Sequence, residues 1–216
     1  MKVCTDSCIL GAWSALRVTN SKNILDIGTG TGLLALMLAQ KSGASIDAIE
    51  SDPGASEQAR ENIEDSPWRE QIRLMEGDAT KYSFVEKYDF IISNPPFYEL
   101  DLHSPIAGKN RAKHDESLTL EQLLGVIKSC LKPGGDFSVL LPFHRTSYFE
   151  NLAGENGFRL LEKLELRQTP GHNPFRSVLL FSTESKGNLL ISKMNIKDEN
   201  GKYSSEFSEL MNEYYG

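Results

Sequence analysis

The sequence predicts a three-layer α/β fold, in which a mainly parallel sheet is covered by helices on both faces. Two observations support this prediction: short apolar runs bounded by turn residues recur along the chain, and segments of helical length lie between them. Strands that alternate with helices are joined by right-handed crossovers, and ligands then bind at the carboxyl ends of the strands. The length of 216 residues and the hydrophobic content of 39% suit a single domain over residues 1–216.

The parallel part of the sheet is expected in the first two thirds of the chain. Apolar runs between turn signals predict its strands at residues 23–27, 45–50, 72–76, 88–93 and 136–141. Good helix formers, or apolar residues at helical spacing, predict the intervening helices at residues 33–41, 53–63 and 118–131.

The pattern changes after Phe149. A helix is expected near 151–156, and two strands joined by a loop with glycine and proline suggest an antiparallel pair at 160–168 and 177–183. Residues 186–216 are expected to form a small C-terminal addition, with a strand-like piece at 188–194, a turn at 198–202 and a helix at 204–215.

Composition limits the possible partners. The 23 basic and 30 acidic side chains give a formal charge of −7, which would repel a polyanion at long range unless basic groups are clustered. This disfavours a general nucleic-acid coat protein, and DNA is not expected as a partner. Three cysteines without a Cys-x-x-Cys pair suggest reduced thiols. His103 and His114 have no second ligand at metal spacing, so no metal is expected.

The location in the cell is also constrained by composition. No apolar run approaches the length of a membrane span, and the first residues lack the basic and apolar blocks of a secretory signal. We therefore expect a cytoplasmic protein without membrane contact. The sequence does not indicate an oligomeric state, and a monomer is assumed.

The stretch ILDIGTGTG joins the first expected strand to the first helix. Its glycines, Gly28, Gly30 and Gly32, can adopt positive φ and let a ligand approach the backbone closely. A dinucleotide fingerprint would place its third glycine at position 33, which is Leu33. The spacing therefore favours a different nucleoside, with Thr29 part of the same loop.

Acidic residues lie at three successive strand ends. Asp26 precedes the glycine loop, Glu50 can accept both ribose hydroxyls, and Asp78 could accept the exocyclic amine of an adenine. The alternative is a tight turn with three solvated carboxylates. We favour a cofactor site because the acids and the glycines recur in register.

The fourth expected strand ends in an unusual tip, in the stretch YDFIISNPPFYEL. An exocyclic amine on a heteroaromatic ring is a poor nucleophile, because its lone pair is delocalised. If Asn94 Oδ1 and the Pro95 carbonyl each accept one amine hydrogen, the lone pair is turned toward a methyl donor. Pro95 and Pro96 fix φ and keep the carbonyl in place. Phe97 offers a stacking face for a flipped base, a contact worth roughly 1 to 3 kcal/mol.

These features together resemble the class I S-adenosylmethionine-dependent methyltransferases, over residues 23–142. The resemblance implies a Rossmann-like, seven-stranded sheet of order 3-2-1-4-5-7-6 with strand 7 antiparallel. It implies S-adenosylmethionine as cofactor and S-adenosylhomocysteine as product. The Asn-Pro-Pro-aromatic signature is that of enzymes that methylate planar nitrogens, which include adenine N6, cytosine N4, guanine N2 and a glutamine amide.

A narrower resemblance covers nearly the whole chain. The segments MKVCTDSCILGAW, GTGTGLLALMLAQ, ENIEDSPW, ISNPPFYE, KNRAKHDESLTLEQLL and PFRSVLLFS are similar to the bacterial valine-tRNA adenine-37 N6-methyltransferases. This implies a tRNA substrate and an N-terminal helical segment, residues 1–20, that borders the cofactor site. The implied cofactor contacts are Thr5, Asp26, Gly28, Thr29, Gly30, Gly32, Glu50, Ser51, Asp78, Ala79 and Asn94. Two departures are a shorter start than in most members and Phe97 where tyrosine is common.

The loop at 98–116 is long and irregular, and such loops at strand ends are often functional. We expect it to close over the RNA and to contact phosphates through Lys109, Arg111, Lys113 and His114. A solvated charged loop is the alternative. Arg167, His172 and Arg176 could extend a basic surface, although ordinary surface charges are favoured there.

The sequence leaves three other kinds of function open: a different methyl acceptor, a non-catalytic binding module and an oxidoreductase. The target could be a guanine N2 of ribosomal RNA or a glutamine amide of a protein. A non-catalytic S-adenosylmethionine-binding module would not require Asn94 and both prolines. A nicotinamide oxidoreductase is disfavoured by Leu33.

Overall fold

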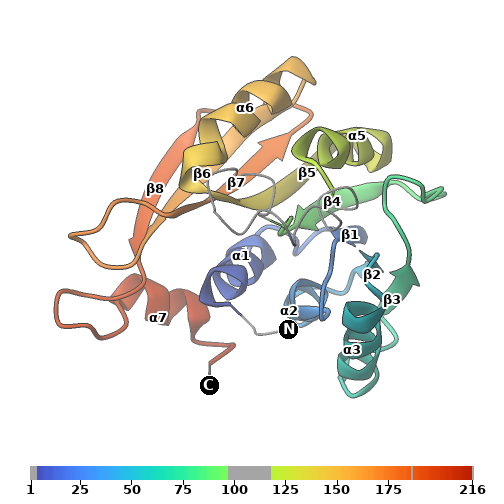
Figure 1. Ribbon diagram of the computed structural model, residues 1–216, viewed down its shortest axis with the longest axis horizontal. Helices are drawn as coiled ribbons and strands as arrows, with labels where there is room; N and C mark the ends of the chain where they lie inside the picture. The colour runs from blue at the N-terminus through green and yellow to red at the C-terminus, as the bar shows by residue number, and fades with distance from the viewer. Residues whose placement is uncertain (1–3, 97–117, 186, 216) are drawn as a thin grey trace, which may run out of the picture.

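The computed structural model describes residues 4–96, 118–185 and 187–215 (Figure 1). Within these ranges the chain forms one sheet of eight strands in the order β3-β2-β1-β4-β5-β7-β6-β8. The strands are β1 Asn23–Ile27, β2 Ser45–Glu50, β3 Ile72–Glu76, β4 Tyr88–Ser93, β5 Leu131–Pro142, β6 Arg159–Arg167, β7 Arg176–Ser182 and β8 Leu190–Asn195.

The first five strands are parallel, and β1 lies between β2 and β4. Register aligns Ile27, the last residue of β1, with Ile49 on β2 and with Ser93 on β4. The residues that follow these strands therefore meet at one edge of the sheet. This is the edge at which the sequence predicts a ligand.

Within the described sheet, β7 alone runs in the opposite direction. β7 is antiparallel to both β5 and β6, as expected for the late pair of strands. The predicted order 3-2-1-4-5-7-6 with strand 7 antiparallel is confirmed. The predicted total of seven strands is wrong, because β8 pairs parallel with β6 and extends the sheet by one strand.

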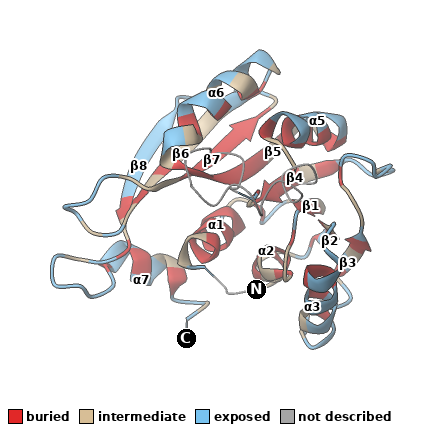
Figure 2. Cartoon of the chain, viewed as in Figure 1, coloured by how far each residue is buried: buried red, intermediate tan, exposed pale blue. Residues whose placement is uncertain are grey.

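Helices cover both faces of the sheet, so the three-layer α/β prediction is confirmed (Figure 1). Two buried apolar clusters, one on each face, make up the core (Figure 2). The first face is covered by α1 Thr5–Ala15, α2 Leu33–Ala39, α3 Pro53–Glu64 and α7 Ser205–Met211; the second is covered by α5 Leu120–Cys130 and α6 Thr146–Glu155, with a 3-10 turn η2 Phe143–Arg145 before α6.

Helix starts are fixed by short polar side chains. Asp52 accepts from the Ala55 amide at 2.8 Å, and Pro53 occupies the first turn of α3. Thr119 and Gln122 form a reciprocal capping box at the start of α5. Ser204 accepts from the Phe207 amide at 3.0 Å and caps α7.

Some element boundaries differ from those that the sequence predicts. The fifth strand starts at Leu131 and not at residue 136, because its first residues pair with β4 across a register shift near Gly134. α7 ends at Met211, four residues before the predicted end.

α1 is buried on almost all sides, between the sheet, α2 and α7. Gly11 lets α1 approach α2, since an added Cβ there would lie 2.6 Å from the Met37 sulfur. Residues after α7 reach back to α2: the Gln40 side chain donates to the Glu213 carbonyl at 3.0 Å, and the Tyr214 hydroxyl donates to the Met37 carbonyl at 3.3 Å. α1 is thus enclosed by elements from both ends of the described chain.

None of the described helices combines the length and the apolar composition that crossing a membrane requires.

Candidate active site

The glycine loop leaves the carboxyl end of β1 and is held against β2. The Gly28 and Thr29 amides donate to the Ile49 carbonyl at 2.9 and 3.1 Å. Gly28, Gly30 and Gly32 have φ of +70°, +60° and +82°, the left-handed region that favours glycine. α2 begins directly after Gly32. The loop therefore places glycine backbone, which carries no side chains, at the edge of the sheet, where a ligand can approach it closely.

Glu50, at the end of β2, braces this loop. Its Oε2 accepts from the Gly30 amide at 2.8 Å, and its Oε1 accepts from the amides of Ser51 and Asp52 at 2.9 and 2.8 Å. These three bonds use three of the roughly four lone-pair sites of the carboxylate, so Oε2 can still accept from a ligand hydroxyl. The predicted contacts Gly30, Glu50 and Ser51 therefore lie together.

Asp26 is fully buried beneath the loop. Its Oδ2 accepts from the Thr29 hydroxyl at 2.6 Å and from the Ala35 amide at 3.2 Å. Its Oδ1 is shielded from solvent and receives no hydrogen bond from the described residues. Burial raises the pKa of this carboxyl from 3.8 to about 7. A cation bound above the loop would favour the ionised form, so the site suits a positively charged ligand.

Asp78 follows β3 and is engaged in a local turn. It accepts from the Thr80 hydroxyl at 2.7 Å and from the Thr80 amide at 2.9 Å, and it pairs with Lys81 at 2.9 Å. These contacts, the Thr80 hydroxyl first, lower the pKa of Asp78. The carboxylate therefore stays ionised as an acceptor. The adjacent Ala79 is buried.

Asn94 lies directly beyond β4. Ser93 fixes the end of that strand beside β1, because its hydroxyl donates to the Ile27 carbonyl at 2.8 Å. The Asn94 Nδ2 donates to the Ser7 hydroxyl oxygen at 2.8 Å. Its Oδ1 is shielded from solvent and has no donor among the described residues. A buried acceptor without a partner costs free energy, so this oxygen is available to a donor that a ligand brings.

The rest of the predicted tetrapeptide is described in part. Pro95 is buried and Pro96 is exposed. Phe97 lies outside the described residues, as do the loop residues Lys109, Arg111, Lys113 and His114.

The start of α1 completes the edge. Thr5, a predicted contact, is hydrogen-bonded with the phenol of Tyr215, which also contacts the Cys8 thiol. Burial raises the pKa of Tyr215 to about 12, so the phenol is neutral at physiological pH. The segment expected to border the site thus lies next to Asn94 through Ser7.

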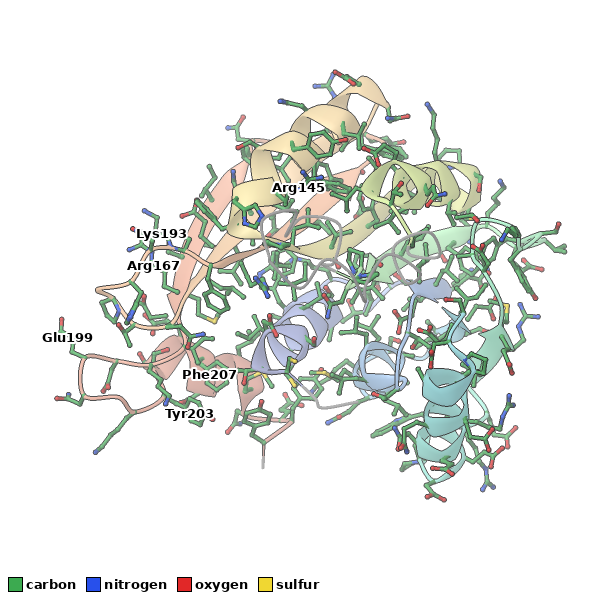
Figure 3. The ribbon with its side chains drawn as sticks, in the orientation of Figure 1. Arg145, Arg167, Lys193, Glu199, Tyr203 and Phe207 are labelled. Atoms are coloured by element: carbon green, nitrogen blue, oxygen red, sulfur yellow. The ribbon has the colours of Figure 1, made fainter. Side chains whose placement is uncertain are left out.

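The late basic residues are not equivalent, because Arg176 pairs with Leu166 on the face of the sheet that α1 covers, whereas Arg167, next to Leu166 on β6, belongs to the opposite face. Arg176 is bound to Asp6 of α1, with Nε and Oδ2 3.1 Å apart. Figure 3 labels Arg167, at the end of β6, and Lys193, on the neighbouring strand β8. The expectation that Arg176 is an ordinary surface charge is wrong, because it anchors α1.

Ser7 is the residue that the sequence analysis missed. It lies 87 residues from Asn94, and a serine within an apolar helical stretch carries no signal of such a contact. No group of three or more His, Cys, Asp or Glu side chains that could hold a metal occurs within residues 4–96, 118–185 and 187–215.

Comparisons with known proteins agree with this geometry. The family model of the methyltransferase small domain matches residues 12–153. A tRNA1(Val) (adenine(37)-N6)-methyltransferase of Dyadobacter fermentans is 42% identical over 100% of this chain and 90% of its own. A protein of the same name from Bacteroides fragilis is 39% identical over 100% and 91%. The fold is similar to that of a predicted O-methyltransferase from Agrobacterium tumefaciens, with a TM-score of 0.73, 18% identity and 94% of each chain covered.

Proposed function

Since the chain belongs to the family of tRNA1(Val) (adenine(37)-N6)-methyltransferases, we propose that it methylates N6 of adenine 37 in tRNA(Val) with S-adenosylmethionine. The single observation that supports this assignment most directly is Asn94 Oδ1. It is a buried acceptor without a donor among the described residues, and it lies where β4 meets the glycine loop. An incoming NH₂ group would supply the missing hydrogen bond.

The residues at the sheet edge fit S-adenosylmethionine. Asp26 and the backbone of the glycine loop suit its amino-acid end, which carries a cationic ammonium group; Glu50 and Ser51 suit the ribose, and Asp78 with Ala79 suits the adenine. Thr5 borders the same edge. When bound, the cofactor supplies a methyl carbon that its sulfonium charge makes electrophilic.

The chain's own contribution is positioning. Asn94 Oδ1 accepts one hydrogen of the target amine and the Pro95 carbonyl accepts the other, so the nitrogen lone pair is turned out of the ring. Pro95 and Pro96 hold the backbone stiff, and Phe97 stacks on the flipped base. The amine proton becomes acidic once the nitrogen is alkylated, so a strong general base before attack is not required.

The RNA is proposed to be held by the loop that follows. We assign phosphate contacts to three loop cations, Lys109, Arg111 and Lys113, with His114 beside them. Positive charge gathered in one loop would offset the net charge of −7 at the point of contact.

The assignment is tested with Asn94→Ala. Removal of one positioned acceptor should lower the turnover number for a tRNA(Val) transcript about 100-fold, while the dissociation constant for S-adenosylmethionine changes less than about threefold. Asn156→Ala is the matched control, because the Asn156 amide bonds the Leu152 carbonyl at the end of α6. Labelled cofactor then identifies the product.

Two outcomes would contradict the proposal. Asn94→Ala could turn over as fast as the control, or label from the wild-type protein could enter a protein band or a guanine and not adenine 37. A transcript with guanine at position 37 should accept no label.

A further inference from the structure

We propose that Ser7 is a positioning residue for methyl transfer, because its hydroxyl supplies the acceptor that the Asn94 amide nitrogen needs while Asn94 Oδ1 is engaged with the target amine. This inference rests on the proposed function of Asn94. It extends the site to α1, which lies outside the glycine loop and the Asn-Pro-Pro tip.

The contact is partly buried, because Ser7 is buried and Asn94 is half-buried. Asn94 Nδ2 and Ser7 Oγ are 2.8 Å apart, and Ser7 is only 9% exposed. A carboxamide has a donor end and an acceptor end of nearly equal size, and each buried end requires a partner. With Ser7 bound to the nitrogen, the oxygen is the end that is left for a ligand.

The benefit of this contact is greatest in the reactive arrangement. When the target amine donates to Oδ1, the Asn94 carboxamide cannot rotate to exchange its oxygen and its nitrogen. After such a rotation the Asn94 NH₂ group and the target NH₂ group, both donors, would face each other. The nitrogen must find its acceptor on the side of α1. Without the Ser7 hydroxyl, the productive orientation leaves the half-buried Asn94 amide N–H without this acceptor, so that orientation is less favoured.

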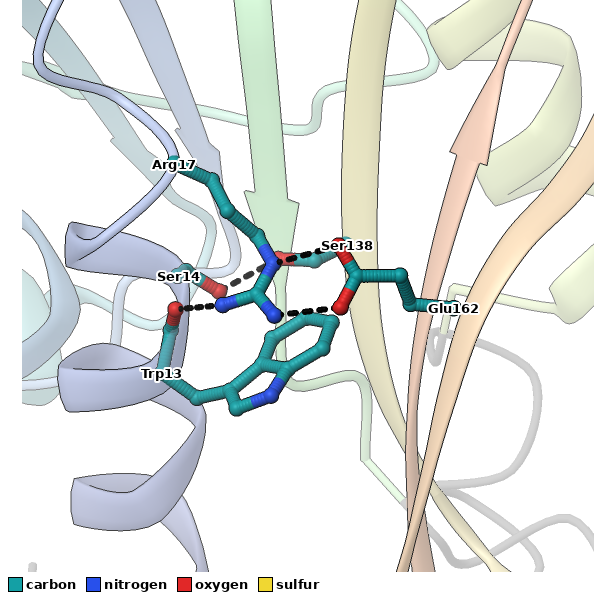
Figure 4. Close-up of polar contacts among 5 residues, drawn as sticks. All are labelled: Trp13, Ser14, Arg17, Ser138 and Glu162. Carbon is teal, nitrogen blue, oxygen red and sulfur yellow. Dashed lines mark hydrogen bonds and ion pairs between the residues drawn. The ribbon is translucent and has the colours of Figure 1, made fainter. Parts of the chain in front are cut away.

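α1 is held firmly enough to serve as a support. Near Ser7, Asp6 accepts from the Ser7 amide at 3.1 Å and pairs with Arg176 of β7 at 3.1 Å. Figure 4 shows the other end of the helix, where the Ser14 and Ser138 hydroxyls are 2.7 Å apart. The helix is thus tied to β5 and β7 on either side of the Ser7 contact.

Arg17 adds a third attachment just beyond α1. Its Nε donates to Glu162 of β6 at 3.1 Å, and its guanidinium carbon lies 3.3 Å from the centre of the Trp13 ring (Figure 4). Such stacking favours one orientation of the guanidinium. Ser7 therefore projects from a helix whose position is set by three strands.

Ser7→Ala is the direct test, measured in the full chain with a tRNA(Val) transcript. Loss of one partly buried neutral hydrogen bond should lower the turnover number about fivefold to tenfold, while the KM for tRNA and the dissociation constant for S-adenosylmethionine stay within about twofold. Ser182→Ala is the matched control, because it removes a buried serine hydroxyl that donates to the Gly135 carbonyl at the end of β7, away from α1 and Asn94. It should leave turnover unchanged. Ser7→Thr keeps the hydroxyl and should restore most of the rate.

A double variant separates positioning from general support of the fold. If Ser7 acts through Asn94, Ser7→Ala should cause no further loss in the Asn94→Ala background. Equal turnover of the Ser7→Ala and Ser182→Ala variants would overturn the inference, and so would a Ser7→Thr variant as slow as Ser7→Ala or an additive loss in the double variant. The proposed function fails by a different result, full turnover of Asn94→Ala alone.

Discussion

The buried carboxyl of Asp26 should make the unliganded protein less stable as pH rises. Its pKa is raised from 3.8 in an ordinary environment to about 7 in the folded protein. Between these two values the unfolded chain has lost the proton and the folded protein has kept it, so unfolding becomes easier as pH increases. The stability associated with the protonated carboxyl is complete below pH 3.8 and is lost as pH rises to about 7.

The size of the effect follows from the two pKa values. Their difference is 7 − 3.8 = 3.2, and at about 1.36 kcal/mol for each pH unit the full cost of ionising Asp26 is about 4 kcal/mol. About half of this cost appears between pH 5.5 and pH 8.5, a range in which unfolding can be measured. Over that range the same relation gives a loss of about 2 kcal/mol. Asp26→Asn removes the ionisation but keeps an oxygen for Thr29 and Ala35.

The assay is urea unfolding of the wild type and Asp26→Asn at several pH values in this window. Other groups titrate in both proteins and cancel in the difference. The wild type should lose about 2 kcal/mol relative to the variant from pH 5.5 to pH 8.5. Parallel stability curves would refute the assignment of a raised pKa to Asp26. A bound cofactor with a positive charge should reduce the difference, because it stabilises the carboxylate.

Two further predictions concern a buried network and the RNA. Tyr88→Phe should lower the free energy of unfolding by about 2 kcal/mol, because the Tyr88 hydroxyl donates to the Asp47 carboxylate at 2.6 Å in the core; the exposed Tyr148→Phe is the control, and equal losses in urea unfolding would contradict the argument. Alanine at the three loop cations should weaken binding of tRNA(Val) and flatten its dependence on salt, measured by filter binding at several salt concentrations. Unchanged affinity and salt slope would remove the loop from the RNA contact.

Much of the fold could be predicted because local patterns determine it. Apolar runs such as 88–93 are too short for helices and too long for turns, and the glycines before α2 indicate a tight strand-to-helix turn. The adjacency of Asn94 and Gly28 also followed from the sequence, because parallel strands place their carboxyl ends at one edge. Asn94, Glu50 and Asp26 were named as site residues from their places at these strand ends and from the family resemblance, and their roles stay predictions.

The missed features depend on distant partners. Leu190 and Ile191 are apolar, which suggests a strand but does not say where it pairs. The strand pairs with β6 because β7 lies between β5 and β6 and leaves the outer edge of β6 available. Arg176 looked like a surface charge because its partner, Asp6, is 170 residues away. Ser7 lacked any signal for the same reason. Contacts of this kind are set by tertiary packing, which no local pattern encodes.

The attachments of α1 have a consequence for the order in which the protein folds. The helix itself can form within its own eleven residues, but its partners Ser138, Glu162 and Arg176 are 124 to 170 residues away along the chain. Contacts at such separation form late, because closing long loops is costly in entropy. In refolding, helical content should therefore recover before methyl transfer does, and the interval between the two includes the docking of α1 against the assembled strands.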